Sequence, residues 1–251
     1  MSFVALTRES FVRPHFKEAK YECLRALRAP GFALPTLFLP AVFYLFFGVV
    51  LAEETTPEID RFLFVGFAIL GVMGPGLFGF GVFVATEREQ GLLALKRALP
   101  MPAAAYLLGK MLMTTAFAAG VTLVVVAAAL ASGRVPLTPA QILTLTAVNV
   151  LGSLPFCALG LFVGTLAGAR SAPVLVNLLF LPMIYLSGIL IPLPEEFASI
   201  QLASPAYHLS RLALSVAGAS IDSAPLVHAA VIAGVTLLFG ALALRRLTQR
   251  G

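Results

Sequence analysis

The acidic, histidine and cysteine side chains of this sequence are too few and too scattered to predict a catalytic centre or a metal site. Glu87 and Glu89 stand on either side of Arg88, and these two carboxylates alone are too few for a two-metal site. The three histidines fall far apart in the predicted topology, so no histidine metal site is predicted. Cys23 and Cys157 are lone cysteines, which predicts neither a disulfide nor a metal site. We therefore predict no catalytic residues.

The sequence also lacks a loop that could hold ATP. A P-loop needs two glycines separated by four residues, followed by lysine and a hydroxyl residue. Gly109-Lys110 has Ala104 in place of the first glycine and Met111 in place of the hydroxyl residue. No cofactor is therefore predicted in this chain. Because Lys110 has methionine and leucine neighbours, we expect its amine to reach the inner membrane interface.

Polar residues inside otherwise apolar stretches are the remaining candidates for a functional role. Such residues often face the pathway of a transported molecule, although hydrogen bonds between packed helices explain many of them. Both interpretations stay open for the candidate pathway residues Asn149, Ser153, Asn177, Ser187 and His228.

The elements that carry these residues are predicted from long intervals without charge. The 251 residues are 59% hydrophobic and only 12% charged, about half the charged fraction of a soluble domain, and the mean hydropathy is +0.97. A helix needs about 20 apolar residues to cross a bilayer, and open sheets are excluded from lipid. We predict an all-α integral membrane protein with six transmembrane helices, at about 32–52, 62–85, 108–132, 142–168, 173–193 and 226–244.

The basic residues predict how these spans are oriented. Most of the 17 lysines and arginines fall before residue 30, between residues 86 and 110, and after residue 244, and cytoplasmic segments carry such an excess. Both termini are therefore predicted to be cytoplasmic, in a multi-pass membrane protein. Topology and contact with membrane lipids explain the net charge of +5, so nucleic-acid binding is not predicted.

The other predicted elements lie at the two membrane surfaces of a single domain, residues 1–251. Residues 1–30 are expected to be a cytoplasmic or interfacial segment, with an amphipathic helix over 14–29 on the membrane or a loosely ordered tail. Residues 87–103 are expected to start a new helix at the membrane exit, with acids in its first turn. Residues 195–222 are expected to form short helices at the outer face.

A stripe of small residues predicts one close helix contact. Gly160, Gly164 and Gly168 recur every four residues inside the predicted span at 142–168. Such a stripe lets two helix backbones approach closely. The spacing leaves open whether the neighbouring helix belongs to this chain or to a second copy.

Three motifs, in this order along the chain, resemble the permeases of ABC-2 type transporters. The first is Glu-Arg-Glu-x-Gly at 87–91, followed by a leucine-bearing segment, prolines and Gly-Lys. The second is Leu-Ser-Gly-Ile at 186–189 with Pro192, similar to the family's Ser-Gly-hydrophobic-x-x-Pro motif. The third is Ser-Pro-Ala-Tyr-His at 204–208, similar to the family's Asn-Pro-x-x-Tyr stretch but with serine first and the tyrosine one residue closer. The resemblance extends over residues 14–246.

This resemblance implies a transmembrane permease subunit of the inner (plasma) membrane that does no chemistry by itself. It implies that a separate ABC ATP-binding subunit, which carries ATP and magnesium, docks on the N-terminal helix and on residues 87–103. It further implies a second permease copy, in a homo- or heterodimer, and export of a drug-like, lipid or glycan substrate. The implied coupling contacts are Glu87, Arg88, Glu89, Gly91 and Leu95.

Two other classes of protein are alternatives. An ion-coupled secondary transporter or channel would want an acid buried at mid-membrane, and no Asp or Glu falls inside the predicted spans. A membrane-embedded lipid-modifying enzyme would need clustered acids at the inner face. The sequence favours neither alternative over a permease.

Overall fold

The described part of the chain is built from helices, without a strand. The computed structural model describes residues 8–52, 56–93, 95, 103–135, 137–188, 196, 198–219 and 224–249, and for 8–16 and 103–105 the backbone alone. The elements in order are α1 (Arg8–Leu27), α2 (Pro30–Phe43), the π-helix η1 (Tyr44–Val50), α3 (Pro57–Glu89), α5 (Ala103–Ser132), α6 (Pro139–Gly152), α7 (Leu154–Leu166), α8 (Ala172–Leu186), α9 (Ala198–Gln201), α10 (Pro205–Val216) and α11 (Pro225–Gln249).

Proline and threonine residues fix where several helices begin. Pro57, Pro139 and Pro205 occupy the first turns of α3, α6 and α10, where the missing N–H would have no partner inside the helix. The hydroxyls of Thr56 and Thr138 accept hydrogen bonds from backbone N–H groups three residues further on, which satisfies otherwise unpaired donors. These starts therefore follow directly from the local sequence.

Five helices are long and apolar enough to cross a membrane: Pro30–Val50, Pro57–Glu89, Tyr106–Ser132, Pro139–Leu166 and Pro225–Thr248. The predicted all-helical membrane fold is therefore confirmed, and these helices overlap five of the six predicted spans. The fourth of them consists of α6 and α7, which are separated at Ser153. The apolar α8 has only 15 residues, and its predicted span continues into residues 189–195, which lie outside the described residues.

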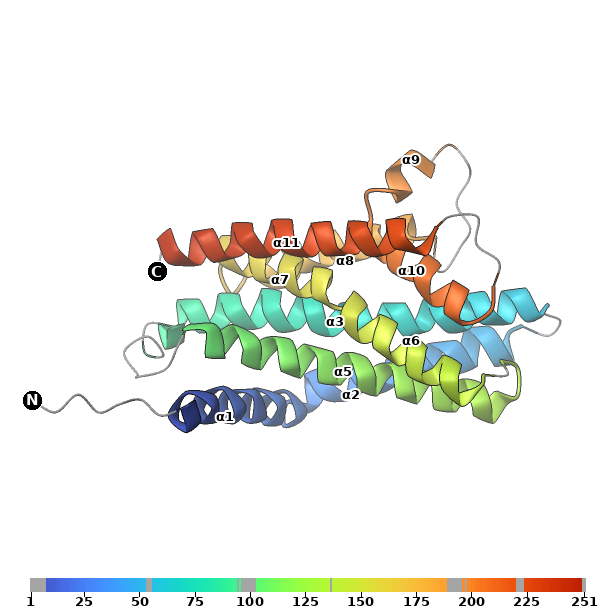
Figure 1. Cartoon of the computed structure of the whole chain (residues 1–251), viewed down its shortest axis with the longest axis horizontal. Coiled ribbons are helices and arrows are strands. Elements are labelled where there is room, and N and C mark those ends of the chain that lie inside the picture. Colours follow the sequence, from blue (N-terminus) through green and yellow to red (C-terminus); the bar gives the residue numbers. More distant parts are fainter. Residues whose placement is uncertain are drawn as a thin grey trace, which may run out of the picture.

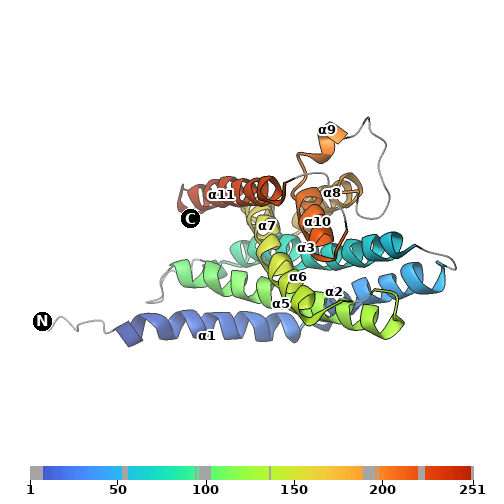
Figure 2. The same ribbon diagram turned by 45° about the vertical axis from the view of Figure 1, so that its right-hand side comes forward.

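Helix α3 lies at the centre of the bundle and α11 lies at its edge. In the most apolar part of α3, 72% of the residues are buried, against 11% in α11. Figures 1 and 2 show α3 between α5 on one side and α7 and α8 on the other. The start of α1 and the end of α11 lie toward one end of the bundle, while α9 and α10 lie toward the other (Figure 1).

The glycine stripe of α7 packs against α3 of the same chain. A Cβ atom at Gly160 would lie 2.5 Å from the carbonyl oxygen of Gly76 and 2.8 Å from that of Leu77. A Cβ atom at Gly164 would lie 3.0 Å from the carbonyl oxygen of Gly81. Glycine is needed at both positions because the two backbones touch. The contact that the sequence left open is therefore made within this chain.

The predicted start of a new helix at Glu87 is wrong. Glu87, Arg88 and Glu89 form the last turn of α3, which continues past the membrane-spanning stretch because no proline or glycine interrupts it after Gly81. The helix ends where Gly91 adopts a φ of +72°, a conformation that glycine adopts at the ends of helices. Leu92, Leu93 and Leu95 are helical again, and most of the segment up to residue 102 lies outside the described residues.

Candidate functional site

Charged residues from three helices meet next to the end of α3. Glu22 and Arg25 come from α1, Glu87 from α3, and Tyr106 and Lys110 from α5; we call these five residues the ion cluster. The Lys110 amine lies 3.1 Å from Glu22 Oε2 and 2.9 Å from Glu87 Oε1. The Tyr106 hydroxyl donates to Glu87 Oε2 at 2.6 Å. The ion cluster therefore links α1 to both α3 and α5.

The charges of the ion cluster are balanced, and all of them except that of Arg25, whose side chain is 44% exposed, are buried. Lys110 is 0% exposed, Glu87 3% and Glu22 4%. Arg25 pairs with Glu22 at 3.1 Å and also with Glu87, so two cations face two carboxylates. Burying an unpaired charge costs several kcal/mol, whereas a paired and hydrogen-bonded set is tolerated. These helices are therefore held in the one arrangement that keeps every charge paired.

The carboxylates of the ion cluster keep Arg25 charged, and one aromatic ring contacts it. Its guanidinium carbon lies 5.1 Å from the centre of the Phe83 ring, close enough for a cation–π contact. Burial alone would lower the pKa of Arg25, but the nearby carboxylates of Glu87 and Glu22 outweigh it and raise that pKa above its usual value. The positive charge on α1 is therefore present at every physiological pH.

The expectation that Lys110 reaches the membrane interface is wrong. Its amine instead ends inside the ion cluster, 5.1 Å from the centre of the Tyr106 ring. Its two carboxylate partners are 88 and 23 residues away in the sequence, so no local pattern could have identified them. The lysine stays buried because both ionic partners reach it there.

The end of α3 is also tied to the connection between α7 and α8. Both terminal nitrogens of Arg88 donate to backbone carbonyls, one to Thr165 and one, at 2.7 Å, to Ala167. A cation at the C-terminal end of a helix satisfies unpaired carbonyls and the helix dipole. Glu89 Oε2 accepts a hydrogen bond from the Ala169 backbone N–H at 2.5 Å. The final turn of α3 is thus fixed to α7 as well as to α1.

The five predicted coupling residues therefore separate into two groups. Glu87 is buried in the ion cluster, and Arg88 and Glu89 bind the connection after α7. Gly91 is exposed and Leu95 is 61% exposed. The side chains of the first group hold the end of α3 in position, and the second group, joined by the exposed Leu92, lies on the surface.

The candidate pathway residues Asn149, Ser153 and Ser187 are buried between helices. The Asn149 side-chain N–H₂ donates to the Thr122 hydroxyl at 3.1 Å, which joins α6 to α5. Ser153 donates to the Val150 carbonyl at 2.7 Å, and Ser187 donates to a carbonyl of its own helix. These bonds match the packing interpretation, and a role on the pathway stays a prediction.

The other two candidate pathway residues have different surroundings. Asn177 is exposed and donates to the Pro173 carbonyl of its own helix at 3.0 Å. His228 is buried and its Nδ1 lies 2.8 Å from Nδ1 of His208. The expectation that the histidines lie far apart is therefore wrong for this pair, because the fold brings α10 against the start of α11. Among the described residues, no three His, Cys, Asp or Glu side chains group as metal ligands.

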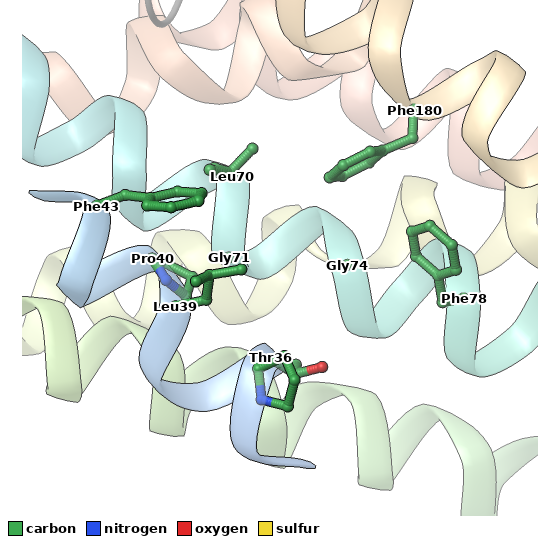
Figure 3. Close-up of a pocket in the computed structure, with 10 residues that line it drawn as sticks. Thr36, Leu39, Pro40, Phe43, Leu70, Gly71, Gly74, Phe78 and Phe180 are labelled. Atoms are coloured by element: carbon green, nitrogen blue, oxygen red, sulfur yellow. The ribbon is translucent and has the colours of Figure 1, made fainter. Parts of the chain in front are cut away.

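An apolar groove lies between α2, α3 and α8. It has a volume of about 250 Å³ and a lining in which only Thr36 carries a polar side chain. Figure 3 shows Phe78 and Phe180 on one side of it and Phe43 on the other. A Cβ atom at Gly74 would meet nothing within 4 Å, so the groove stays open at this point.

Comparisons with known proteins agree with the resemblance of the motifs. The family described as "ABC-2 type transporter" matches residues 18–221. The "Putative transport permease YvfS" of Bacillus subtilis (strain 168) is 26% identical over 198 residues, which is 76% of this chain and 80% of that relative. The family match covers α3, the ion cluster and the helices up to α10. The chain therefore belongs to the ABC-2 type transporter family and is a membrane transport permease.

Proposed function

We propose that this permease is the transmembrane subunit of an ATP-driven exporter, moved by a separate ABC ATP-binding subunit. The observation that carries the proposal is the ion cluster, which joins α1 to α3 and α5 beside the exposed residues after α3. A push on α1 or on the segment after α3 would reach α5 through buried ionic contacts, which resist separation because separated charges stay desolvated.

Six crossings with both termini in the cytoplasm form part of this proposal. Five long apolar helices and the shorter α8 supply the spans, and a span at α8 would continue beyond Leu186. An even number of crossings places both termini on one side, and α1 starts at the end of the bundle where α11 finishes (Figure 1). We place that end in the cytoplasm of a bacterial cell, and we treat residues 1–251 as one transmembrane domain.

In this proposal, the exposed coupling residues contact the ATP-binding subunit and the buried ones hold the end of α3 in position. Gly91, Leu92 and Leu95 would touch the partner, since their surfaces are exposed. Glu87 and Arg88 would act by holding the end of α3, because their side chains are occupied within the chain. ATP and magnesium would bind in the partner subunit. A second permease copy, identical or related, would complete the complex.

The apolar groove favours a cargo with an apolar part. Its lining is aliphatic and aromatic apart from Thr36, so a drug-like molecule or a lipid would gain more from it than a glycan would. An ion-coupled mechanism has less support, because the buried acids Asp60 and Glu87 of α3 lie in its first and last turns. A lipid-modifying enzyme has less support too, since both carboxylates of the ion cluster are held by cations.

The proposal is tested with Leu95→Asp in the complex of the permease with its ATP-binding subunit. A charge at this exposed leucine should leave the permease folded, but it should weaken docking and lower ATPase activity in the complex by at least about tenfold. Ile200→Asp is the matched control. Ile200 is an aliphatic residue like Leu95, it is 49% exposed, and it lies on α9 at the other end of the bundle. Equal activity of the two variants, or ATP hydrolysis by the purified permease alone, would overturn the proposal.

A further inference from the structure

Two buried histidines join α10 to α11 at the end of the bundle opposite the ion cluster. His208 on α10 and His228 on α11 are each 2% exposed. Their Nδ1 atoms are 2.8 Å apart, and Nε2 of His208 lies 2.9 Å from the Leu202 carbonyl oxygen. We propose that this histidine pair is a pH-sensitive latch, which holds α10 against α11 when it is neutral and releases it in acid.

The hydrogen bonds fix the tautomers of the neutral pair. A carbonyl oxygen only accepts, so Nε2 of His208 must carry a proton and donate to Leu202. The Nδ1 of neutral His208 is then an acceptor, and Nδ1 of His228 must donate to it. One proton therefore lies between the two Nδ1 atoms, and the contact has no room for a second.

Acid opposes this contact because both imidazoles gain protons. Protonated histidines donate from both ring nitrogens, so two protonated rings would direct two N–H groups at each other across 2.8 Å. Once the helices separate, water can solvate both charges. The separated state then binds more protons than the closed state, and falling pH favours the state that binds more protons.

The charged neighbours favour opening in acid. Tyr207 packs against both rings, with centroid distances of 5.4 and 6.1 Å, and the Arg211 guanidinium lies 5.1 Å from the centre of the Tyr207 ring. That fixed positive charge disfavours a further positive charge at the pair. Among the described residues of the elements packed on α10 and α11, the other ionisable groups are Glu58, Asp60, Arg61, Glu87, Arg88 and Glu89 of α3, Cys157 of α7, Tyr185 of α8 and Arg245 and Arg246 of α11. The last three of α3 lie in its final turn, in and beside the ion cluster.

Most of these groups are engaged or distant from the pair. Arg61 donates to the Gly218 carbonyl at 3.3 Å, and Asp60 pairs with Arg134. Arg245 and Arg246 lie at the opposite end of α11. Tyr185 is exposed. The latch therefore responds chiefly to the two imidazoles and Arg211, and it would act on the outer face, where α10 lies beside the start of α11 (Figure 2).

Hydrogen–deuterium exchange of the permease in lipid nanodiscs tests the latch. Exchange of α10 and of the first turns of α11 is compared at pH 7.5 and 5.0, after correction for the intrinsic rate. We call the state in which α10 has separated from α11 the open state. If one imidazole with an ordinary histidine pKa is protonated only in the open state, lowering the pH from 7.5 to 5.0 raises the open fraction by roughly 30-fold. We expect protection to fall by at least about tenfold in α10, while α6 stays unchanged.

Two variants of His228 separate the latch from general acid sensitivity. His228→Asn keeps a donor to His208 and can turn its amide oxygen toward a protonated ring, so it should remove the pH response. His228→Lys fixes a charge at the contact, so it should show the low protection already at pH 7.5. The proposal is overturned if wild-type α10 is equally protected at both pH values, or if His228→Asn responds to acid as the wild type does. Should His228→Asn not fold, His208→Asn, which offers an oxygen to His228, must lose the response.

Discussion

Replacing Lys110 with methionine probes the ion cluster directly. Methionine fills a similar volume, so the main change is the loss of one buried cation. Glu22 and Glu87, which lie 3.1 and 2.9 Å from the amine, would then lose the cation between them, and Arg25 would be the one cation of the ion cluster left to offset two carboxylates. Removing one member of a buried ionic pair costs about 3–5 kcal/mol. We therefore expect Lys110→Met to lower the free energy of unfolding by about 3 kcal/mol.

Thermal unfolding of the purified permease measures this loss. A change of about 3 kcal/mol corresponds to a fall in Tm of roughly 6–12 °C for a chain of this size. Lys20→Met is the matched control, because Lys20 is an exposed lysine on α1, the helix that carries Glu22 and Arg25. Its effect should stay within about 0.5 kcal/mol.

Adding Glu87→Gln to Lys110→Met removes one of the two carboxylates that the lost cation neutralised, and it still leaves an acceptor for Tyr106. The double variant should therefore lose less free energy of unfolding than the two single variants lose together. A Lys110→Met protein as stable as the wild type would refute the reasoning. Strictly additive losses in the double variant would refute it as well.

Two further substitutions test how α7 is fixed to α3. Gly160→Ala places a methyl group 2.5 and 2.8 Å from carbonyl oxygens of α3, so it should lower the free energy of unfolding by about 1–3 kcal/mol. Gly234→Ala is the control, because a Cβ atom there would meet nothing within 4 Å; it should be neutral or stabilise by up to about 1 kcal/mol. Equal effects of these two glycine substitutions would contradict the α3–α7 contact. Arg88→Met removes charged donors from two carbonyls at the end of α7 and should cost about 1.5–3 kcal/mol; an unchanged Tm would show that these bonds do not hold the helix end.

The membrane fold could be predicted because one physical effect dominates it. Ionised side chains avoid hydrocarbon, so the intervals without charge marked the long helices before any contact was known. Gly91 marks the end of α3 in the sequence, but the charged residues before it suggested the start of a new helix. They continue α3 instead, because a helix ends only where its backbone geometry changes.

The ion cluster and the histidine pair could not be predicted from the sequence. Lys110 looked like an isolated amine among apolar residues, since Glu22 lies 88 residues away. His208 and His228 are 20 residues apart, on two helices whose relative placement the sequence pattern leaves undetermined. A motif singled out Glu87, and its burial indicates a positioning role that the motif could not show.

The central claim is that the permease crosses the membrane with the end of α3 in the cytoplasm, within reach of an ATP-binding subunit. It is tested by labelling single cysteines with a membrane-impermeant maleimide, in a background with Cys23→Ser and Cys157→Ala. Ile200→Cys should be labelled in intact cells, and Leu95→Cys should be labelled only after the cells are made permeable. Labelling of Leu95→Cys in intact cells would contradict the account.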